Sequence, residues 1–367
     1  MKKIKLGMTS FILTGVLLAG CGTSTESESI KVLSKDVRAD TVVQESELKV
    51  MKSESLPISK AATYSGLAYE ALYLNEDGAT YRFDPMTKEK EKVADMEFYT
   101  ISESGNKALA NVKNKFFVLD LTTGQSKEIG QSGEQYEYYF ADVAGEEVIH
   151  VKAEKQGYSV HLIDAETAKR TTWTLDDTFD FNGFTITGVR KGKESLYTAL
   201  KNKDGEEGLY ELRLDGEIQL ITALKDIESL STFDFLTDEK IIFNDLYKGK
   251  SGIYTFDLNT QEVVQLVAGG EDKEGIWVPF YLLSPDQTKM LFDVPVQVGD
   301  EYKTNVYVGE LVGDQLTNIT TVMTAADLYG VIPISARWSE DSQQVYIATN
   351  ERPNDTIETI EVFQITK

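Results

Sequence analysis

Short apolar runs recur along the chain from about residue 70 to the C-terminus. Each run holds six or seven residues, is rich in apolar and β-branched side chains, and either alternates apolar with polar residues or is apolar over most of its length. Gly, Asn and Asp separate the runs, a pattern typical of β-strands joined by turns. No stretch after residue 55 keeps a helical period, so we expect an all-β fold. The runs are EALYLN (70–75), KALANV (107–112), EVIHVKA (147–153), SLYTAL (195–200), KIIFND (240–245), KMLFDV (289–294) and QVYIATN (344–350).

A second series of strands follows these runs, and most of its members end in an acidic residue and a turn. The aligned positions are 36 to 54 residues apart, and four of them begin the pattern D-x-x-T. At the end of a strand an Asp carboxylate can accept the backbone N–H two residues on, and the Thr hydroxyl can close the turn. We interpret the acids as turn residues, with a ring of cation ligands as the alternative. The positions are Asp84, Asp120, Asp164, Asp215, Asp257, Glu310 and, without the acid, Gln364.

Seven repeated units of this size predict a β-propeller, in which each four-stranded blade stacks on its neighbours, with six or eight blades as alternatives. The last unit has runs at Ile332–Trp338, Gln344–Ala348 and Glu358–Ile365, one strand short of a blade. A strand from the N-terminal side would close the ring and remove an open edge. The first candidate is Thr41–Met51 and the second is Leu56–Ala61.

The first 21 residues follow a different pattern. Three lysines precede an uncharged, mostly apolar run from Leu6 to Gly20, which is shorter than the roughly 20 residues that span a bilayer. The run ends in LAGC (18–21), and Cys21 is the only cysteine of the chain. This segment resembles the lipobox of bacterial lipoproteins. The resemblance implies a diacylglycerol on the sulfur of Cys21 and cleavage between Gly20 and Cys21; the alternative is a structural cysteine after an uncleaved anchor helix.

Charge supports attachment through lipid rather than through a basic surface. Loss of residues 1–20 with their three lysines would change the formal net charge from −23 to −26. Such an acidic protein repels nucleic acid and anionic lipid, so we expect no nucleic-acid partner and contact with the bilayer only through lipidated Cys21. Residues 22–55 lack aromatic side chains and are rich in Ser, Glu and Lys, which predicts a flexible tether. The expected organisation is therefore a signal peptide (1–20), Cys21 with a polar tether that could include the ring-closing strand (21–55), and a propeller (56–367).

Two kinds of turn sequence resemble the repeats of TolB-type propellers. In those repeats a Ser-Pro-Asp-Gly turn joins the first two strands of a blade, and a D-L-x-T-G-E turn joins the last two. The chain reads SPDQTKMLF at 284–292 and YTFDLNTQE at 254–262. DLTTGQ (120–125) is a good copy of the second turn, whereas 102–105 and 339–341 are degraded copies of the first. The resemblance covers the whole expected propeller and implies a fold, but this architecture hosts binding scaffolds, lyases, peptidase gates and dehydrogenases alike.

Motifs for chemistry are absent from the sequence. His150 and His161 are the only histidines, and both lie in strand-like runs where we interpret them as structural. The chain has no H-E-x-x-H, cysteine cluster, G-x-S-x-G elbow or phosphate loop, so we expect no catalytic residue, metal or cofactor. The segment around Asp180 is similar to a calcium loop, but Thr178 and Val189 occupy positions where tight calcium binding needs acids.

The candidate ligand-binding residues are Trp277, Arg337 and Trp338, which fall on the expected first strands of the last two units. Residues there would line a central funnel, where the rings could stack on a ligand and Arg337 could supply charge. The alternative is that the rings pack between blades, as Trp173 also would. The aromatic run YEYYF (136–140) is a further candidate for an exposed contact patch.

These patterns predict a lipoprotein on the extracytoplasmic face of the cell membrane, with a monomeric propeller that binds a protein or a cell-envelope component. We favour a Gram-positive surface, because a long acidic tether suits a protein held under a thick wall. One alternative is a propeller hydrolase or lyase acting on a sugar, lactone or peptide. Another is a structural assembly protein resembling the TolB-type members of outer-membrane machinery.

Overall fold

The computed structural model describes most of the chain from residue 48 onward and one short segment before it. The expected signal peptide, Cys21 and the segment around Asp180 lie outside the described residues. The described residues are 30–32, 48–58, 63–68, 71–131, 136–155, 157–175, 189–192, 195–201, 204, 207–221, 224, 227, 232–272, 275–328, 330–350 and 359–367.

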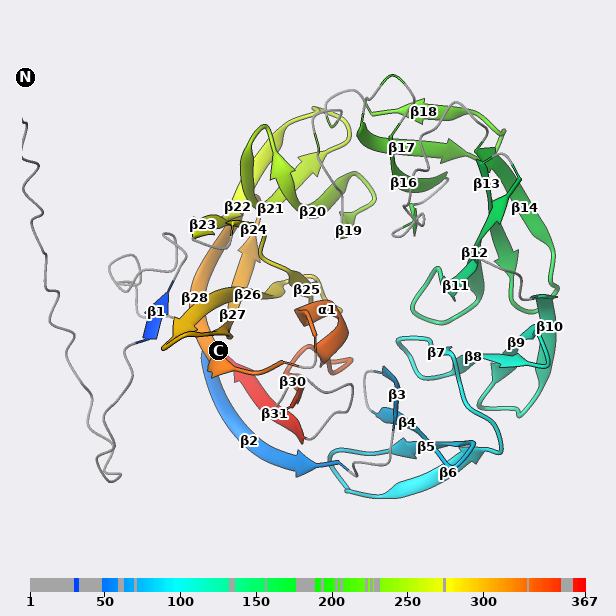
Figure 1. The fold of residues 1–367 in the computed structure, drawn as a ribbon, viewed down its shortest axis with the longest axis horizontal. Coiled ribbons are helices and arrows are strands. Elements are labelled where there is room, and N and C mark those ends of the chain that lie inside the picture. Colours follow the sequence, from blue (N-terminus) through cyan, green and yellow to red (C-terminus); the bar gives the residue numbers. More distant parts are fainter. Residues whose placement is uncertain are drawn as a thin grey trace, which may run out of the picture.

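Antiparallel four-stranded sheets are arranged as a ring around a central axis (Figure 1). The described residues form seven blades, six of four strands and one, blade 6, with a short fifth strand, which confirms the predicted propeller and its seven-bladed form. Blade 1 is β3 (Thr63–Leu67), β4 (Leu72–Glu76), β5 (Ala79–Phe83) and β6 (Lys90–Ala94); blade 2 is β7 (Thr100–Ile101), β8 (Lys107–Val112), β9 (Lys115–Asp120) and β10 (Ser126–Gln131). Blade 3 is β11 (Tyr136–Phe140), β12 (Glu147–Glu154), β13 (Gly157–Asp164) and β14 (Arg170–Leu175); blade 4 is β15 (Arg190–Lys191), β16 (Ser195–Lys201), β17 (Glu207–Arg213) and β18 (Ile218–Leu220).

The last three blades complete the ring, and the final blade draws strands from both ends of the chain. Blade 5 is β19 (Thr232–Thr237), β20 (Lys240–Tyr247), β21 (Lys250–Asp257) and β22 (Val263–Ala268); blade 6 is β25 (Tyr281–Leu283), β26 (Lys289–Val298), β27 (Glu301–Val312) and β28 (Gln315–Ala326). Blade 7 is β29 (Ala336–Trp338), β30 (Gln344–Thr349), β31 (Thr359–Thr366) and β2 (Lys49–Pro57).

An N-terminal strand fills the outermost place of blade 7. β2 pairs antiparallel with β31, from Lys49 opposite Thr366 to Pro57 opposite Thr359. The strand straddles the two sequence candidates, since it contains the end of Thr41–Met51 and the start of Leu56–Ala61. Leu48 and Leu56 fix its position because both are 3% exposed, one packed against blade 6 and the other against blade 1.

Apolar clusters between neighbouring blades hold the ring together. The described residues form seven clusters, one at each interface between two blades. In β12, Ile149 and Val151 pack toward blade 4, whereas Val148 packs toward blade 2. Because side chains alternate between the two faces of a strand, a strand buried on both faces is apolar at nearly every position. The seven runs found in the sequence are the second strands of the seven blades for this reason.

The repeated acids form the expected turns. A carboxylate oxygen of Asp164 accepts the backbone N–H of Glu166 at 3.1 Å and of Thr167 at 2.7 Å, and Thr167 Oγ1 accepts the N–H of Lys169 at 3.3 Å. The residue after the threonine has a positive φ, +61° at Ala168. The same pattern of hydrogen bonds recurs at Asp84, Asp120 and Asp257.

The turns between the first and second strands also repeat their hydrogen bonds. Ser284 Oγ donates to Asp286 at 2.6 Å and accepts the backbone N–H of Lys289 at 2.9 Å. In blade 7, Ser339 Oγ likewise donates to Asp341 at 2.6 Å and accepts the N–H of Gln344 at 2.8 Å. The degraded copy at 339–341 therefore keeps the geometry of the turn, and at 102–105 Ser102 Oγ likewise accepts the backbone N–H of Lys107 at 3.1 Å.

Two parts of the chain near blade 6 differ from the expected strands. Trp277 lies in an additional hairpin, β23 (Gly270–Asp272) with β24 (Gly275–Trp277), and not on the first strand of blade 6. The run Ile332–Trp338 is divided: α1 (Ile332–Ser335) is a single helical turn with proline near its start, and only Ala336–Trp338 form β29. Among the described residues no helix is long and apolar enough to cross a membrane.

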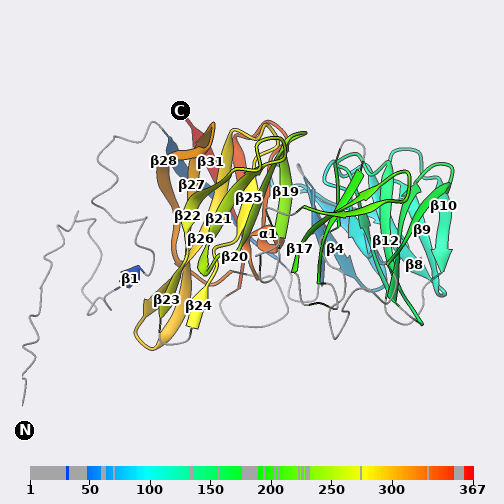
Figure 2. The ribbon, with the colours of Figure 1, turned by 90° about the horizontal axis from the view of Figure 1, so that it is seen from above.

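Blade 6 is longer than the others and projects beyond one face of the ring. The tip of the β26–β27 hairpin and the β23–β24 hairpin extend on the face opposite to the C-terminus (Figure 2). The short strand β1 (Ile30–Val32) pairs with the projecting end of β26, with Ile30 opposite Val298.

Candidate functional site

A recess of about 280 Å³ lies on the axis of the propeller, where the innermost strands end. Six blades contribute to its lining, from the turn after β7 in blade 2 to β29 in blade 7. Its walls combine apolar side chains such as Val143, Phe235 and Leu282 with charged ones. A site built from six separate units can form only after the ring has closed.

Arg337 and Glu103 join two blades that are not neighbours. Arg337 Nη1 lies 3.0 Å from a carboxylate oxygen of Glu103, so an ion pair connects blade 7 with blade 2 at the recess. The Arg337 side chain is 19% exposed. Its Nε is buried without a hydrogen-bond partner among the described residues, which identifies Arg337 as a side chain with an unmet hydrogen-bonding requirement.

A second ion pair borders the recess. Arg190 Nε on β15 lies 3.1 Å from a carboxylate oxygen of Asp234 on β19, and both side chains keep over a third of their surface exposed at the recess. Burial raises the pKa of the Asp234 carboxyl above its usual value, while Arg190 opposes the rise. Burial alone would lower the pKa of Arg190, but nearby Asp234 and Tyr139 raise it overall.

The charges around the recess balance within pairs. Lys191 is ion-paired with Glu147, as Arg190 is with Asp234 and Arg337 with Glu103. The recess is therefore close to neutral, although the whole chain carries a formal net charge of −23. Apolar walls beside an arginine are typical of protein contact sites.

The structure places the three candidate ligand-binding residues in two regions. Arg337 and Trp338 both border the recess, but Trp338 is 1% exposed and its Nε1 donates to the Leu282 carbonyl at 3.3 Å. Trp338 thus packs between blades 6 and 7. Trp277 packs within the cluster between blades 5 and 6 and over Gly270, away from the residues that line the recess.

The other aromatic candidates are mainly structural. Trp173 is 2% exposed, and its Nε1 donates to the Arg213 carbonyl in the next blade at 2.6 Å. In the YEYYF run, Tyr138 is 2% exposed and Tyr139 Oη accepts the backbone N–H of Val189 at 3.0 Å. The described part of that run therefore forms no exposed patch, since its rings pack at the interfaces of blade 3 with the neighbouring blades.

Of the three charged residues Glu103, Arg190 and Asp234, the last two have no signal in the sequence. Glu103 occupies a turn that resembles the family pattern, but Arg190 and Asp234 belong to no motif. Only the order of strands shows that all three residues meet at the axis. No group of three or more His, Cys, Asp or Glu within the described ranges is arranged to hold a metal ion.

Comparison with known proteins agrees with the fold. No protein-family model and no curated protein matches the chain. A chain of the mitotic checkpoint complex is 8% identical with a TM-score of 0.50, covering 98% of this chain and 100% of that chain. Hydrazine synthase from Kuenenia stuttgartiensis is 13% identical (TM-score 0.48; 87% and 98% covered), and TolB from Acinetobacter baumannii is also 13% identical (TM-score 0.45; 83% and 79% covered). At these identities the likeness concerns the fold alone: the chain is a seven-bladed β-propeller, with TolB proteins among the solved structures that it resembles.

Proposed function

We propose that the protein is a lipid-anchored binding or scaffold protein on the extracytoplasmic face of the cell membrane, where the axial recess contacts a protein partner. The observation that carries the binding role is the recess itself, in which Arg337 and neighbouring apolar side chains meet at the end of the innermost strands. The anchor rests on the LAGC sequence at Cys21.

Charge favours a contact at the recess over other surfaces. An acidic chain repels acidic partners over most of its surface, but the recess is close to neutral because its charges are paired. A partner loop that inserts there would bury apolar area beside Val143 and Leu282 without leaving a desolvated, unpaired charge.

The attachment of β1 supports an orientation for this contact. β1 pairs with the end of β26 that projects away from the C-terminus (Figure 2). The turn at 284–287, which lines the recess, comes before β26 and therefore lies at the opposite end of that strand. Ile30 follows Cys21 by nine positions, and nine residues of extended chain span at most about 30 Å. A lipid on Cys21 would therefore hold the projecting hairpins toward the membrane and leave the recess facing away from it.

Site-specific photo-crosslinking in intact cells tests the recess as the contact. The crosslinker replaces Val143, which is 45% exposed at the recess, and in the control it replaces Leu214, which is 57% exposed in the turn after β17. We expect one protein band from position 143 and none from position 214. Equal labelling from both positions, or none from 143, would contradict a partner at the recess.

Metabolic labelling with an alkyne fatty acid tests the anchor separately. We expect label on the wild-type protein and none on Cys21→Ser. A wild-type protein without label would exclude the lipid anchor, while leaving the crosslinking result at the recess unaffected.

A further inference from the structure

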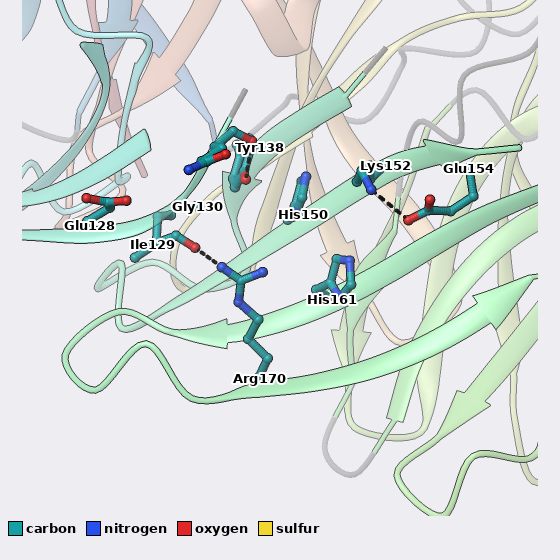
Figure 3. A pocket seen from close by; sticks show the side chains of 10 residues that line it. Glu128, Ile129, Gly130, Tyr138, His150, Lys152, Glu154, His161 and Arg170 are labelled. Carbon is teal, nitrogen blue, oxygen red and sulfur yellow. Dashed lines mark hydrogen bonds and ion pairs between the residues drawn. The ribbon is translucent and has the colours of Figure 1, made fainter. Parts of the chain in front are cut away.

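A second pocket, of about 640 Å³, lies between blades 2 and 3, away from the axial recess (Figure 3). β10 of blade 2 forms one wall with Ile129 and Gly130, and blade 3 forms the other with side chains from four strands. Its volume falls within the range of small-molecule sites. No residue of this pocket takes part in the proposed contact at the axis.

The histidines are cross-strand partners in the pocket wall. His150 on β12 lies opposite His161 on β13, and their rings stack with centroids 5.0 Å apart. Tyr138 on β11 stacks on the other face of the His150 ring at 3.9 Å. His161 Nδ1 lies 2.9 Å from Thr172 Oγ1.

The other blades show what this pair of positions normally holds. In blade 3 the acid of the D-x-x-T turn, Asp164, lies opposite Glu147. The histidines lie three residues further into the two strands, and the other blades have an equivalent pair of positions. Blades 5 and 6 carry stacked Phe–Tyr pairs there, Phe243 with Tyr254 and Phe292 with Tyr307. Blades 1 and 2 carry Leu74 with Tyr81 and Ala110 with Phe117. Blade 7 carries Ile347 with Glu361, so a charged residue also occurs at this pair of positions. Blade 3 differs from these five blades because it carries two imidazoles.

No hydrogen bond offsets the burial of the His150 imidazole among the described residues. His150 is 4% exposed, and both ring nitrogens lack a hydrogen-bond partner among the described residues. A buried polar group without a partner is unfavourable relative to an apolar group of the same shape. His150 lines the pocket, and a bound ligand is therefore a candidate partner for these nitrogens.

The charged groups around the imidazoles favour an acidic ligand. Arg170 on β14 donates through Nη2 to the Ile129 carbonyl, a neutral acceptor, so its charge has no carboxylate partner among the described residues. Gly130 lets the Tyr138 hydroxyl and the Arg170 guanidinium lie close to its backbone, since a Cβ there would be 2.4 Å from Tyr138 Oη and 3.4 Å from Arg170 Nη2. The remaining charges are paired: Lys152 with Glu154 at 2.9 Å and Glu128 with Lys115 at 2.7 Å.

We propose that this pocket binds a small organic anion whose carboxylate or phosphate group is held between Arg170 and the imidazoles of His150 and His161. Arg170 supplies a planar set of donors that matches either acid. On binding, one imidazole takes up a proton from the buffer, and the resulting imidazolium donates to the ligand. Bound anion and proton stabilise each other, so affinity rises as pH falls toward 6.

NMR of histidine side chains tests the site directly, because the whole chain has two histidines. Imidazole ¹⁵N shifts of the full-length protein are recorded at pH 6.5 with inorganic phosphate, glycerol 3-phosphate, succinate or neutral glycerol as probes. We expect at least one acidic probe to shift a ring toward the imidazolium form and glycerol to have no effect. The phosphate and carboxylate arms separate the two kinds of acid. No shift with any acidic probe at 10 mM, or a shift with Zn²⁺ alone, would overturn the proposal.

Two substitutions separate binding from folding. Arg170→Gln should weaken the responding probe by about tenfold or more, the usual effect of removing a charged hydrogen-bond donor, whereas Arg213→Gln in the next blade should not. His150→Phe restores the Phe–aromatic pair of blades 5 and 6, so it should fold well yet abolish proton uptake, measured by calorimetry in two buffers of different ionisation enthalpy. Unchanged affinity and proton uptake in both Arg170→Gln and His150→Phe would contradict the site.

Discussion

Two buried titratable side chains, His150 and Asp293, should make the stability of this propeller depend on pH. His150 is buried between two aromatic rings, and burial first, with nearby cationic groups, lowers the pKa of its imidazole from 6.5 to about 3. Asp293 shows the reverse: burial raises the pKa of its carboxyl to about 7, although backbone N–H groups of Phe280 and Ile332 oppose the rise. These two residues contribute slopes of opposite sign in overlapping pH ranges.

The His150→Phe variant should be less sensitive to acid than the wild type. A neutral buried imidazole contributes stability above the unfolded pKa of about 6.5, and this contribution is lost as pH falls toward 3, because the unfolded chain binds the proton more tightly. One pKa unit corresponds to about 1.4 kcal/mol, so the loss at pH 4.5 is on the order of a few kcal/mol. Urea denaturation at pH 7 and pH 4.5 measures the difference. Equal acid destabilisation of both proteins would contradict a buried neutral imidazole.

The Asp293 carboxyl should destabilise the folded protein as pH rises, the reverse of the pH trend expected for His150, and Asp293→Asn should remove this effect. A carboxyl with a raised pKa keeps its proton in the folded state, so its contribution is fully present below about pH 4 and is lost as pH rises through 7. We expect the variant to gain stability relative to the wild type between pH 4 and pH 8, by up to a few kcal/mol. Asp95→Asn, at a side chain that is 87% exposed, serves as the control. A difference between variant and wild type that does not change with pH would show that Asp293 is ionised throughout.

The D-x-x-T turns are the elements in which sequence and structure agree most closely. The carboxylate of each aspartate accepts backbone N–H groups two and three residues on, as at Asp84 and Asp257. The residue after the threonine requires a positive φ, which is +71° at Gly124 but also +58° at Gln261. The turn therefore keeps its form even where the glycine of the related repeats is missing, at an energetic cost.

Exchanging glycine and alanine between two of these turns tests that cost. Ala168→Gly should stabilise the protein by roughly 0.5–1 kcal/mol, because φ of +61° is unfavourable for a side chain with a Cβ. Gly124→Ala should destabilise it by a similar amount, since the added Cβ meets no atom within 4 Å and only the backbone is strained. Chemical denaturation of the two variants gives both values. Changes of the same sign would refute the argument.

Closure of the ring depends on the two ends of the chain meeting in blade 7. β2 covers the edge of β31 and buries Leu48 and Leu56 on either side. Without β2, blade 7 would present an open strand edge, and the cluster between blades 7 and 1 would lose a wall.

A chain that starts at residue 59 should therefore be far less stable than one that starts at residue 48. Burial of the two leucines alone contributes about 2 kcal/mol each, which corresponds to a fall in Tm of roughly 10 °C. Thermal unfolding and light scattering of both forms provide the measurement. The shorter form should also aggregate. Equal Tm values would mean that β2 is not part of the stable ring.

Much of the molecule follows from local pattern. The seven second strands are apolar on both faces, and the turns carry their own hydrogen-bonding groups, so blade number and strand order were predictable from the chain. The ring-closing strand was predictable in kind, because one blade lacked a strand, but its position was set by where Leu48 and Leu56 find their clusters. Trp277 was assigned to the wrong strand because a short apolar run does not reveal whether it pairs with the preceding hairpin or with the next blade.

The recess and the pocket exist only in the closed ring, because residues of more than one blade line each of them. Glu103 and Arg337 are 234 residues apart, and they meet only because every blade turns its first strand toward the axis. The pocket of blade 3 likewise needs β10 of its neighbour as a wall, so the sequence alone does not show that the two histidines line it. Hydrophobic alternation and turn chemistry act over a few residues and can be seen in the sequence. Recesses form between units distant in the chain, and their position depends on the summed geometry of the blades.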